Sequence, residues 1–131
     1  MENQEAQKIA QVYYFLEARL SVLLKNREIL INKIIEIEKT IESLKGLKKG
    51  NDFILPIGSG TFVFSEKISK EHVLVDIGSN IFVEKSLEDA IKVLGERKSR
   101  IEDMVSSLEN EILDAQQKLK ILAERFEKLR K

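Results

Sequence analysis

Apolar residues recur at alternating steps of four and three positions through both outer segments of the chain. Ten of eleven such positions in the first segment and twelve of thirteen in the last are apolar, the exceptions being Arg27 and Lys98. An apolar period of about 3.5 residues sustained this long is typical of a coiled coil, so the pattern predicts two long helices. The first series is Ile9, Tyr13, Leu16, Leu20, Leu23, Arg27, Leu30, Ile34, Ile37, Ile41 and Leu44. The second is Leu87, Ile91, Leu94, Lys98, Ile101, Val105, Leu108, Ile112, Ala115, Leu119, Leu122, Phe126 and Leu129.

Local signals indicate where the first helix ends and the second begins. Gly46 and Gly50 favour the end of the first helix, because glycine adopts the left-handed conformation common at helix C-termini. Ser86 followed three residues later by Asp89 predicts an N-cap for the second helix. The predicted organisation is one structural unit with a coiled-coil helix at 1–48, a β-rich assembly segment at 49–85 and a coiled-coil helix at 86–131.

The two helices have similar lengths and are joined by a folded insert, so we expect them to pack antiparallel, seam against seam. Residue 9 would then face the region of residue 123, and both chain ends would lie at one tip. Arg27 and Lys98 are the polar residues of the seam. Such residues either set the register or extend their long side chains to the surface, and we favour the second interpretation.

The middle segment contains four short runs rich in β-branched and aromatic residues, separated by turn residues. This pattern predicts two β-hairpins. The phrase Ile-Gly-Ser-x-x-Phe-Val occurs twice, and a strand rather than a helix follows each Gly-Ser, which favours turns over phosphate-binding loops. Apolar residues on both strand faces indicate that the hairpins pair with other subunits. The runs are Phe53–Ile57, Thr61–Ile68, His72–Ile77 and Ile81–Glu84.

Composition argues against several classes of function. Lys+Arg and Asp+Glu are each 22, and this zero net charge argues against binding to nucleic acid. Cysteine is absent and His72 is the only histidine, so we expect no metal site, no cofactor and no enzymatic activity. No apolar run approaches the roughly 18 residues of a membrane span, and the N-terminus lacks a signal-peptide pattern, so we expect a cytoplasmic protein without membrane contact.

The predicted tip carries the most suggestive local feature, the run Val12-Tyr13-Tyr14-Phe15-Leu16. One helical seam hides only about two of five consecutive bulky residues, because the run spans more than one turn. The opposing helix brings Leu119, Leu122, Phe126 and Leu129. Two interpretations stay open here. The residues either pack tightly within the end of the coiled coil, or they form an exposed apolar patch that binds other proteins.

The β-rich segment resembles prefoldin, specifically its α-class subunits. The resemblance is carried by Leu55–Gly60, by Val75–Lys85 and by Glu88–Ile91, which match a Pro-x-Gly turn and an Ile-Gly-x-x-x-x-Val-Glu-Lys stretch entering the second helix. The implied fold is α+β: a long antiparallel coiled-coil hairpin with two inserted β-hairpins, which join an inter-subunit β-barrel body. The implied assembly has two α and four β subunits.

The resemblance also implies a function and its residues. A prefoldin holds non-native proteins at its coiled-coil tips without ATP and passes them to a group II chaperonin. The alternative is a structural coiled-coil adaptor that oligomerises through its β-hairpins and binds one defined partner. Carried onto this chain, the client-binding residues are Ile9, Val12, Tyr13, Tyr14, Phe15, Leu16, Leu119, Leu122, Phe126 and Leu129. The assembly residues are Ile57, Phe62, Phe64, Val75, Ile77, Ile81, Phe82 and Val83.

Overall fold

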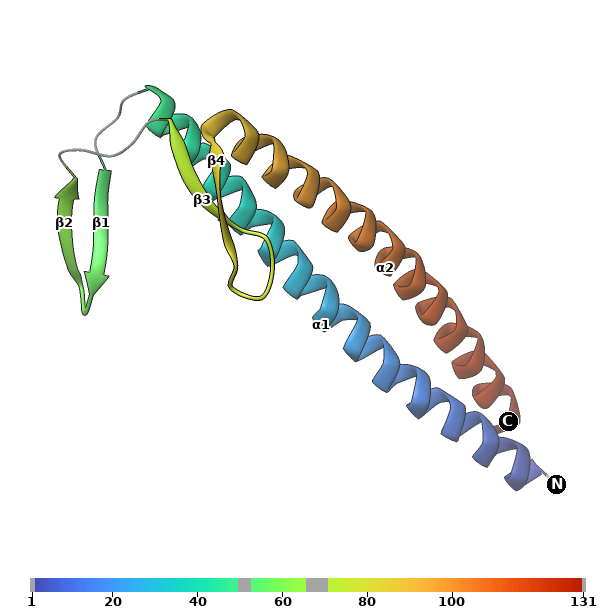
Figure 1. The fold of residues 1–131 in the computed structure, drawn as a ribbon. Coiled ribbons are helices and arrows are strands. Elements are labelled where there is room, and N and C mark those ends of the chain that lie inside the picture. Colours follow the sequence, from blue (N-terminus) through green and yellow to red (C-terminus); the bar gives the residue numbers. More distant parts are fainter. Residues whose placement is uncertain (1, 50–52, 66–70, 131) are drawn as a thin grey trace. The chain divides into compact units, whose positions relative to one another are not determined.

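The computed structural model describes residues 2–49, 53–65 and 71–130 of the chain. Two long helices are separated along the sequence by two small antiparallel β-hairpins, which confirms the predicted α+β fold (Figure 1). The chain forms two compact units: a terminal unit of Met1–Lys33 and Ile101–Lys131, and a central unit of Ile34–Arg100. The elements are α1 (Glu2–Lys49), β1 (Phe53–Gly58), β2 (Thr61–Ser65), β3 (His72–Asp76), β4 (Phe82–Ser86) and α2 (Leu87–Arg130).

In the terminal unit, α1 and α2 run antiparallel. Ile9 shares a groove with Leu122 and Phe126, whereas Leu30 shares one with Leu108. Residue numbers therefore increase along α1 as the numbers of the facing residues decrease along α2. The expectation that residue 9 faces the region of residue 123 is therefore confirmed.

The coiled-coil seam follows the predicted heptad positions. Every predicted seam residue is buried or half-buried except Phe126, which is exposed at the end of the coil. Leu23, Ile112 and Ala115 are the buried seam residues of the terminal unit. Burial of a leucine or isoleucine side chain contributes roughly 1.5–3 kcal/mol, so the repeated seam contacts hold the two helices together.

The core of the central unit fixes one hairpin to the helices. Leu44 of α1, Val75 of β3, and Leu87 and Ala90 of α2 form a buried cluster, and Ala90 is fully inaccessible to solvent. The half-buried residues packed against this cluster are Leu47, Val73, Ile91 and Leu94. The β3–β4 hairpin therefore has one face covered by its own chain.

Polar contacts also fasten the β3–β4 hairpin. The Arg97 Nη2 group donates a hydrogen bond to the Asp76 carbonyl at 2.6 Å, and the Leu87 N–H donates to the Glu71 carbonyl at 3.2 Å. The start of α2 is capped as predicted, because the Asp89 N–H donates to Ser86 Oγ at 3.1 Å. These bonds tie both ends of the hairpin to α2.

The β1–β2 hairpin is built differently. Ile54 pairs with Phe64 and Pro56 with Phe62, so these four side chains share one face, while Leu55 pairs with Val63 on the other. Large hydrophobic side chains are exposed on both faces. Among the described residues, each strand pairs along one edge and leaves its other edge without a strand partner.

Both hairpin turns use the repeated Gly-Ser phrase in the same way. Gly58 and Gly78 have φ values of 125° and 123°, and the serine after each also has a positive φ. Glycine is required at the first position because an L side chain is strained there. The Ile77 N–H donates to the Ile81 carbonyl at 2.9 Å, which closes the second turn. The prediction of turns at both phrases is confirmed.

Several predicted boundaries differ from the structure. Gly46 does not end the first helix, because α1 continues to Lys49, and Gly50 lies outside the described residues. The strand expected at Thr61–Ile68 is observed at Thr61–Ser65, and residues 66–68 lie outside the described part. The strand β4 begins one residue later than predicted and continues to Ser86.

Lys98 shows how a cation is accommodated in the seam. Its Nζ group lies 3.2 Å from Glu38 Oε1 of α1, and about a third of the side chain is exposed. The ammonium group thus reaches the surface, as we favoured, and forms an ion pair across the two helices. Among the described residues, no helix combines the length and apolarity needed to cross a membrane.

Candidate functional site

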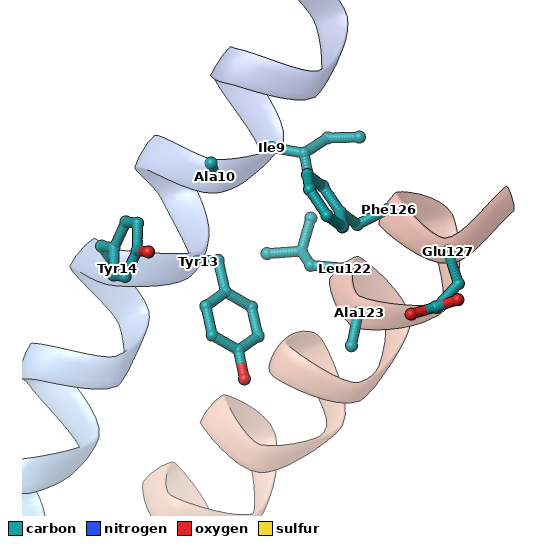
Figure 2. A pocket seen from close by; sticks show the side chains of 8 residues that line it. All are labelled: Ile9, Ala10, Tyr13, Tyr14, Leu122, Ala123, Phe126 and Glu127. Carbon is teal, nitrogen blue, oxygen red and sulfur yellow. The ribbon is translucent and has the colours of Figure 1, made fainter. Parts of the chain in front are cut away.

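A groove of about 270 Å³ lies between α1 and α2 in the terminal unit (Figure 2). We call it the tip groove, because it lies where α1 begins and α2 ends. Its lining is apolar apart from two tyrosine hydroxyls and one carboxylate. The lining residues are Ile9, Ala10, Tyr13, Tyr14, Leu122, Ala123, Phe126 and Glu127.

The aromatic side chains give the tip groove its shape. The rings of Tyr13 and Tyr14 meet edge to face, with centroids 6.3 Å apart and planes at 85°. Figure 2 shows Tyr13 directed toward α2, with Tyr14 farther from that helix. Tyr13 is half-buried, whereas Tyr14 is 68% exposed. The groove therefore combines a seam-anchored ring with a ring available to another molecule.

Glu127 is the acidic group of the tip groove. Its Oε1 atom lies 3.8 Å from Arg130 Nη1 one turn later on α2, and both side chains are largely exposed. A pair of this kind contributes little to stability, because water screens it on most sides. The groove consequently offers mainly apolar contact.

The structure separates the predicted client-binding residues into three groups. Five line the tip groove, three are half-buried in the seam, and two are exposed but do not line the groove. The groove residues are Ile9, Tyr13, Tyr14, Leu122 and Phe126; the seam residues are Leu16, Leu119 and Leu129; the remaining two are Val12 and Phe15.

Three groove residues were not among those expected from the sequence: Ala10, Ala123 and Glu127. Each follows a seam position by one residue, at positions 9, 122 and 126. Their heptad positions, next to the seam positions, would have identified them from the sequence. The small alanines leave the space that the groove occupies.

The predicted assembly residues also fall into two groups. Val75 and Val83 pair with each other across β3 and β4; Val75 is buried and Val83 half-buried, so this pair faces the chain's own core. The other six are exposed, Phe64 most of all at 82%. Those six are Ile57, Phe62, Phe64, Ile77, Ile81 and Phe82.

Other exposed apolar side chains extend the hairpin surfaces. Leu74, on the outward face of β3, is 69% exposed, and Ile54, Leu55 and Val63 are exposed in the β1–β2 hairpin. Strand alternation from Val75 would have identified Leu74. Apolar residues of this size on two-stranded hairpins indicate contact surfaces.

His72 is the titratable residue that the sequence singled out. His72 Nδ1 lies 4.0 Å from Glu84 Oε1, and both side chains are largely exposed. Across residues 2–49, 53–65 and 71–130, no group of three or more histidine, cysteine, aspartate or glutamate residues is placed to hold a metal ion. The expectation that the chain is not an enzyme stays a prediction.

Two packed helices with an apolar groove, combined with two hairpins that expose apolar strands, define a coiled-coil protein of the interaction type. A family model described as "Prefoldin subunit" matches residues 13–131. The chain therefore belongs to the prefoldin family, and this membership supports a chaperone-type role.

Relatives and a solved structure agree with this assignment. A prefoldin subunit alpha of Pyrococcus horikoshii is 27% identical over 121 residues, which cover 89% of this chain and 82% of the relative. One of Nitrosopumilus maritimus is 31% identical and covers 91% and 83%, respectively. The filamentous PFD of Methanocaldococcus jannaschii, solved by cryo-EM, shares the fold with a TM-score of 0.73 at 23% identity, covering 91% of this chain and 98% of that chain.

Proposed function

We propose that the chain is a subunit of an ATP-independent holdase that captures non-native polypeptides at its coiled-coil tip and delivers them to a group II chaperonin. The observation that carries this proposal is the apolar tip groove, which is lined in part by the exposed Tyr14, with the exposed Phe15 next to it in sequence on the other flank of the coil. Non-native proteins expose apolar side chains, and a shallow apolar groove binds such side chains without selecting one sequence.

The shallow groove supports weak and reversible capture. A groove of about 270 Å³ accommodates one or two large side chains rather than a folded domain. Several such tips in one assembly would hold a client through combined weak contacts, because linked sites raise the effective concentration of the next contact. Weak individual contacts also permit transfer when a chaperonin competes for the client.

Assembly is the second part of the proposal. The β1–β2 hairpin exposes apolar residues on both faces, and two strands alone are marginally stable in water. We assign the hairpins to a β-barrel body shared between subunits, with two copies of this chain and four prefoldin β subunits. The outward face of β3–β4, with Leu74 and Phe82, would supply a second surface in that body.

The test of capture is a tip variant that leaves the seam intact. Tyr14→Ser combined with Phe15→Ser removes two exposed rings, at a stability cost that we expect to stay below about 0.5 kcal/mol for each change. Seam residues such as Tyr13 and Leu122 are unsuitable, because serine there would also loosen the coil. We expect the double variant to lose suppression of aggregation of a chemically unfolded client while its assembly keeps the same mass.

The matched control is Leu113→Ser, which removes an exposed apolar side chain of α2 outside the tip groove. It should retain aggregation suppression. Full holding activity in the Tyr14→Ser/Phe15→Ser variant would contradict the assignment of the tip. Binding of one defined partner with no effect on unrelated unfolded proteins would instead support the adaptor alternative.

A further inference from the structure

The two helices of the terminal unit leave two flanks beside their shared seam. One flank contains the tip groove. The other flank contains a second groove of about 440 Å³, which is lined by Asn26 and Ile29 of α1 and by Met104 and Ser107 of α2. Seam residues Leu30 and Leu108 complete this second groove. Each helix contributes residues to both flanks, because residues lie on both sides of the seam positions of a helix.

An apolar stripe follows α1 along this second flank. Steps of seven residues back from Ile29 reach Val22 and Phe15, and a step of three more reaches Val12. Phe15, Val22 and Ile29 are 69%, 58% and 57% exposed. We call these four residues the flank stripe. From residue 12 to residue 29 it rises about 25 Å along the helix.

Cations accompany the flank stripe. The same heptad steps place Lys8 and Arg19 beside it on α1, and Arg125 and Lys128 beside it on α2. All four side chains are exposed, and none of them takes part in an ion pair within the described part of the chain. The carboxylates on this flank are Glu5, Glu111 and Asp114.

The balance of charge differs between the two flanks. Asp114 forms an ion pair with Lys118 at 3.0 Å, so its negative charge does not offset the positive charges of the four cations beside the stripe. On the tip-groove flank, Glu127 lies beside Arg130, and the negative charge of Glu17 is offset by the positive charge of Lys120 on the same flank. The tip groove therefore offers apolar contact with little net charge, whereas the flank stripe offers apolar contact among excess cations.

We propose that the flank stripe is a second client surface, which takes apolar segments of non-native proteins whose bulky side chains are interspersed with carboxylates. The apolar stripe would supply most of the affinity, and the surrounding cations would select acidic over basic segments. The inference rests on the proposed function, since it names a class of client for the same tip.

The test compares two unstructured fluorescent peptides of equal length and identical apolar residues, one with glutamate and one with lysine at the polar positions. Binding to the assembled complex is followed by fluorescence anisotropy at low and high salt. Two new charge contacts should make the acidic peptide bind about threefold to tenfold more tightly at low salt. The difference should shrink as salt rises, because exposed charges are screened.

Arg19→Glu combined with Arg125→Glu should abolish or reverse this preference. The matched control is Lys25→Glu, because Lys25 is an exposed α1 cation that the heptad places on neither flank. Phe15→Ser combined with Val22→Ser should weaken binding of the acidic peptide about as much as the charge changes do. Sedimentation shows whether each variant keeps the mass of the complex.

Equal binding of both peptides to the unaltered complex, or a preference that survives in the arginine double variant, would overturn the inference. A sedimentation coefficient that changes with Arg19→Glu would assign the flank to contact between copies and would also overturn it. If Tyr14→Ser/Phe15→Ser abolishes holding activity while the peptides bind alike, the proposed function stands without this inference. If the unaltered complex binds neither peptides nor clients, the proposed function itself fails.

Discussion

Val75→Ala should loosen the β3–β4 hairpin on the helices of the central unit. Val75 is 8% exposed and packs with Leu44, Leu87 and Ala90. Alanine lacks two of its methyl groups, which removes about 1.6 kcal/mol of burial at about 0.8 kcal/mol per group. The cavity left behind raises the expected cost to about 2 kcal/mol.

Amide hydrogen exchange of the isolated chain measures this loss directly. If the hairpin opens locally, about 2 kcal/mol corresponds to exchange roughly 25-fold faster at the hydrogen-bonded amides of β3 and β4. The matched control is Leu74→Ala. Leu74 precedes Val75 and lies on the outward face at 69% exposure, so its truncation should change exchange by no more than about twofold.

The two substitutions therefore report on opposite faces of one strand. In the assembled complex, Leu74→Ala should become the costly change if the outward face contacts another subunit. Slower or unchanged exchange in the Val75→Ala variant would refute the placement of Val75 in the core. Equal acceleration by both variants in the isolated chain would show that the hairpin lacks a distinct inner face.

Three further predictions concern the hairpins and α2. Phe62→Asp combined with Phe82→Asp should prevent assembly, because both rings are exposed in the isolated chain and a carboxylate buried without a partner is costly; sedimentation at the mass of the unaltered complex would contradict this. Gly78→Ala should destabilise the β3–β4 turn by at least about 1 kcal/mol, since its φ is 123° although its surroundings have room for a methyl group. Gly95→Ala, in the interior of α2 with equal room, should instead stabilise by about 0.5–1 kcal/mol, and thermal unfolding with hydrogen exchange distinguishes the two signs.

The seam was predictable because the heptad is a local property of sequence. Apolar side chains spaced about 3.5 residues apart reach one helix face whatever the partner is, so the predicted seam residues other than Phe126 were placed correctly. Gly46 was misjudged for the opposite reason. The low helix propensity of glycine destabilises a helix by about 1 kcal/mol relative to alanine. Packing of Leu44 and Leu47 in the core of the central unit outweighs that cost.

The surfaces were less predictable, because they depend on which neighbour a residue faces. Val12 and Tyr13 are adjacent in a uniformly bulky run, yet only Tyr13 lines the tip groove. Predicting which of the two lines the groove requires the antiparallel orientation of α2, because that orientation decides which residues of α2 face each side of α1. Val75 and Phe82 were both expected at the assembly surface, yet only Val75 packs against the helices, because strands with apolar residues on both faces do not reveal which face meets the helices.

The exposed apolar faces of the β1–β2 hairpin have a consequence for how many copies of each subunit a cell makes. Under the proposed assembly, a copy made in excess of its partners would display Phe62 and Phe64 on an uncovered two-stranded hairpin, a surface of the kind that non-native proteins display. Surplus copies would thus compete with genuine clients for completed assemblies, or be removed by proteolysis. Under the proposed assembly, matched production of the subunits would keep this apolar surface covered.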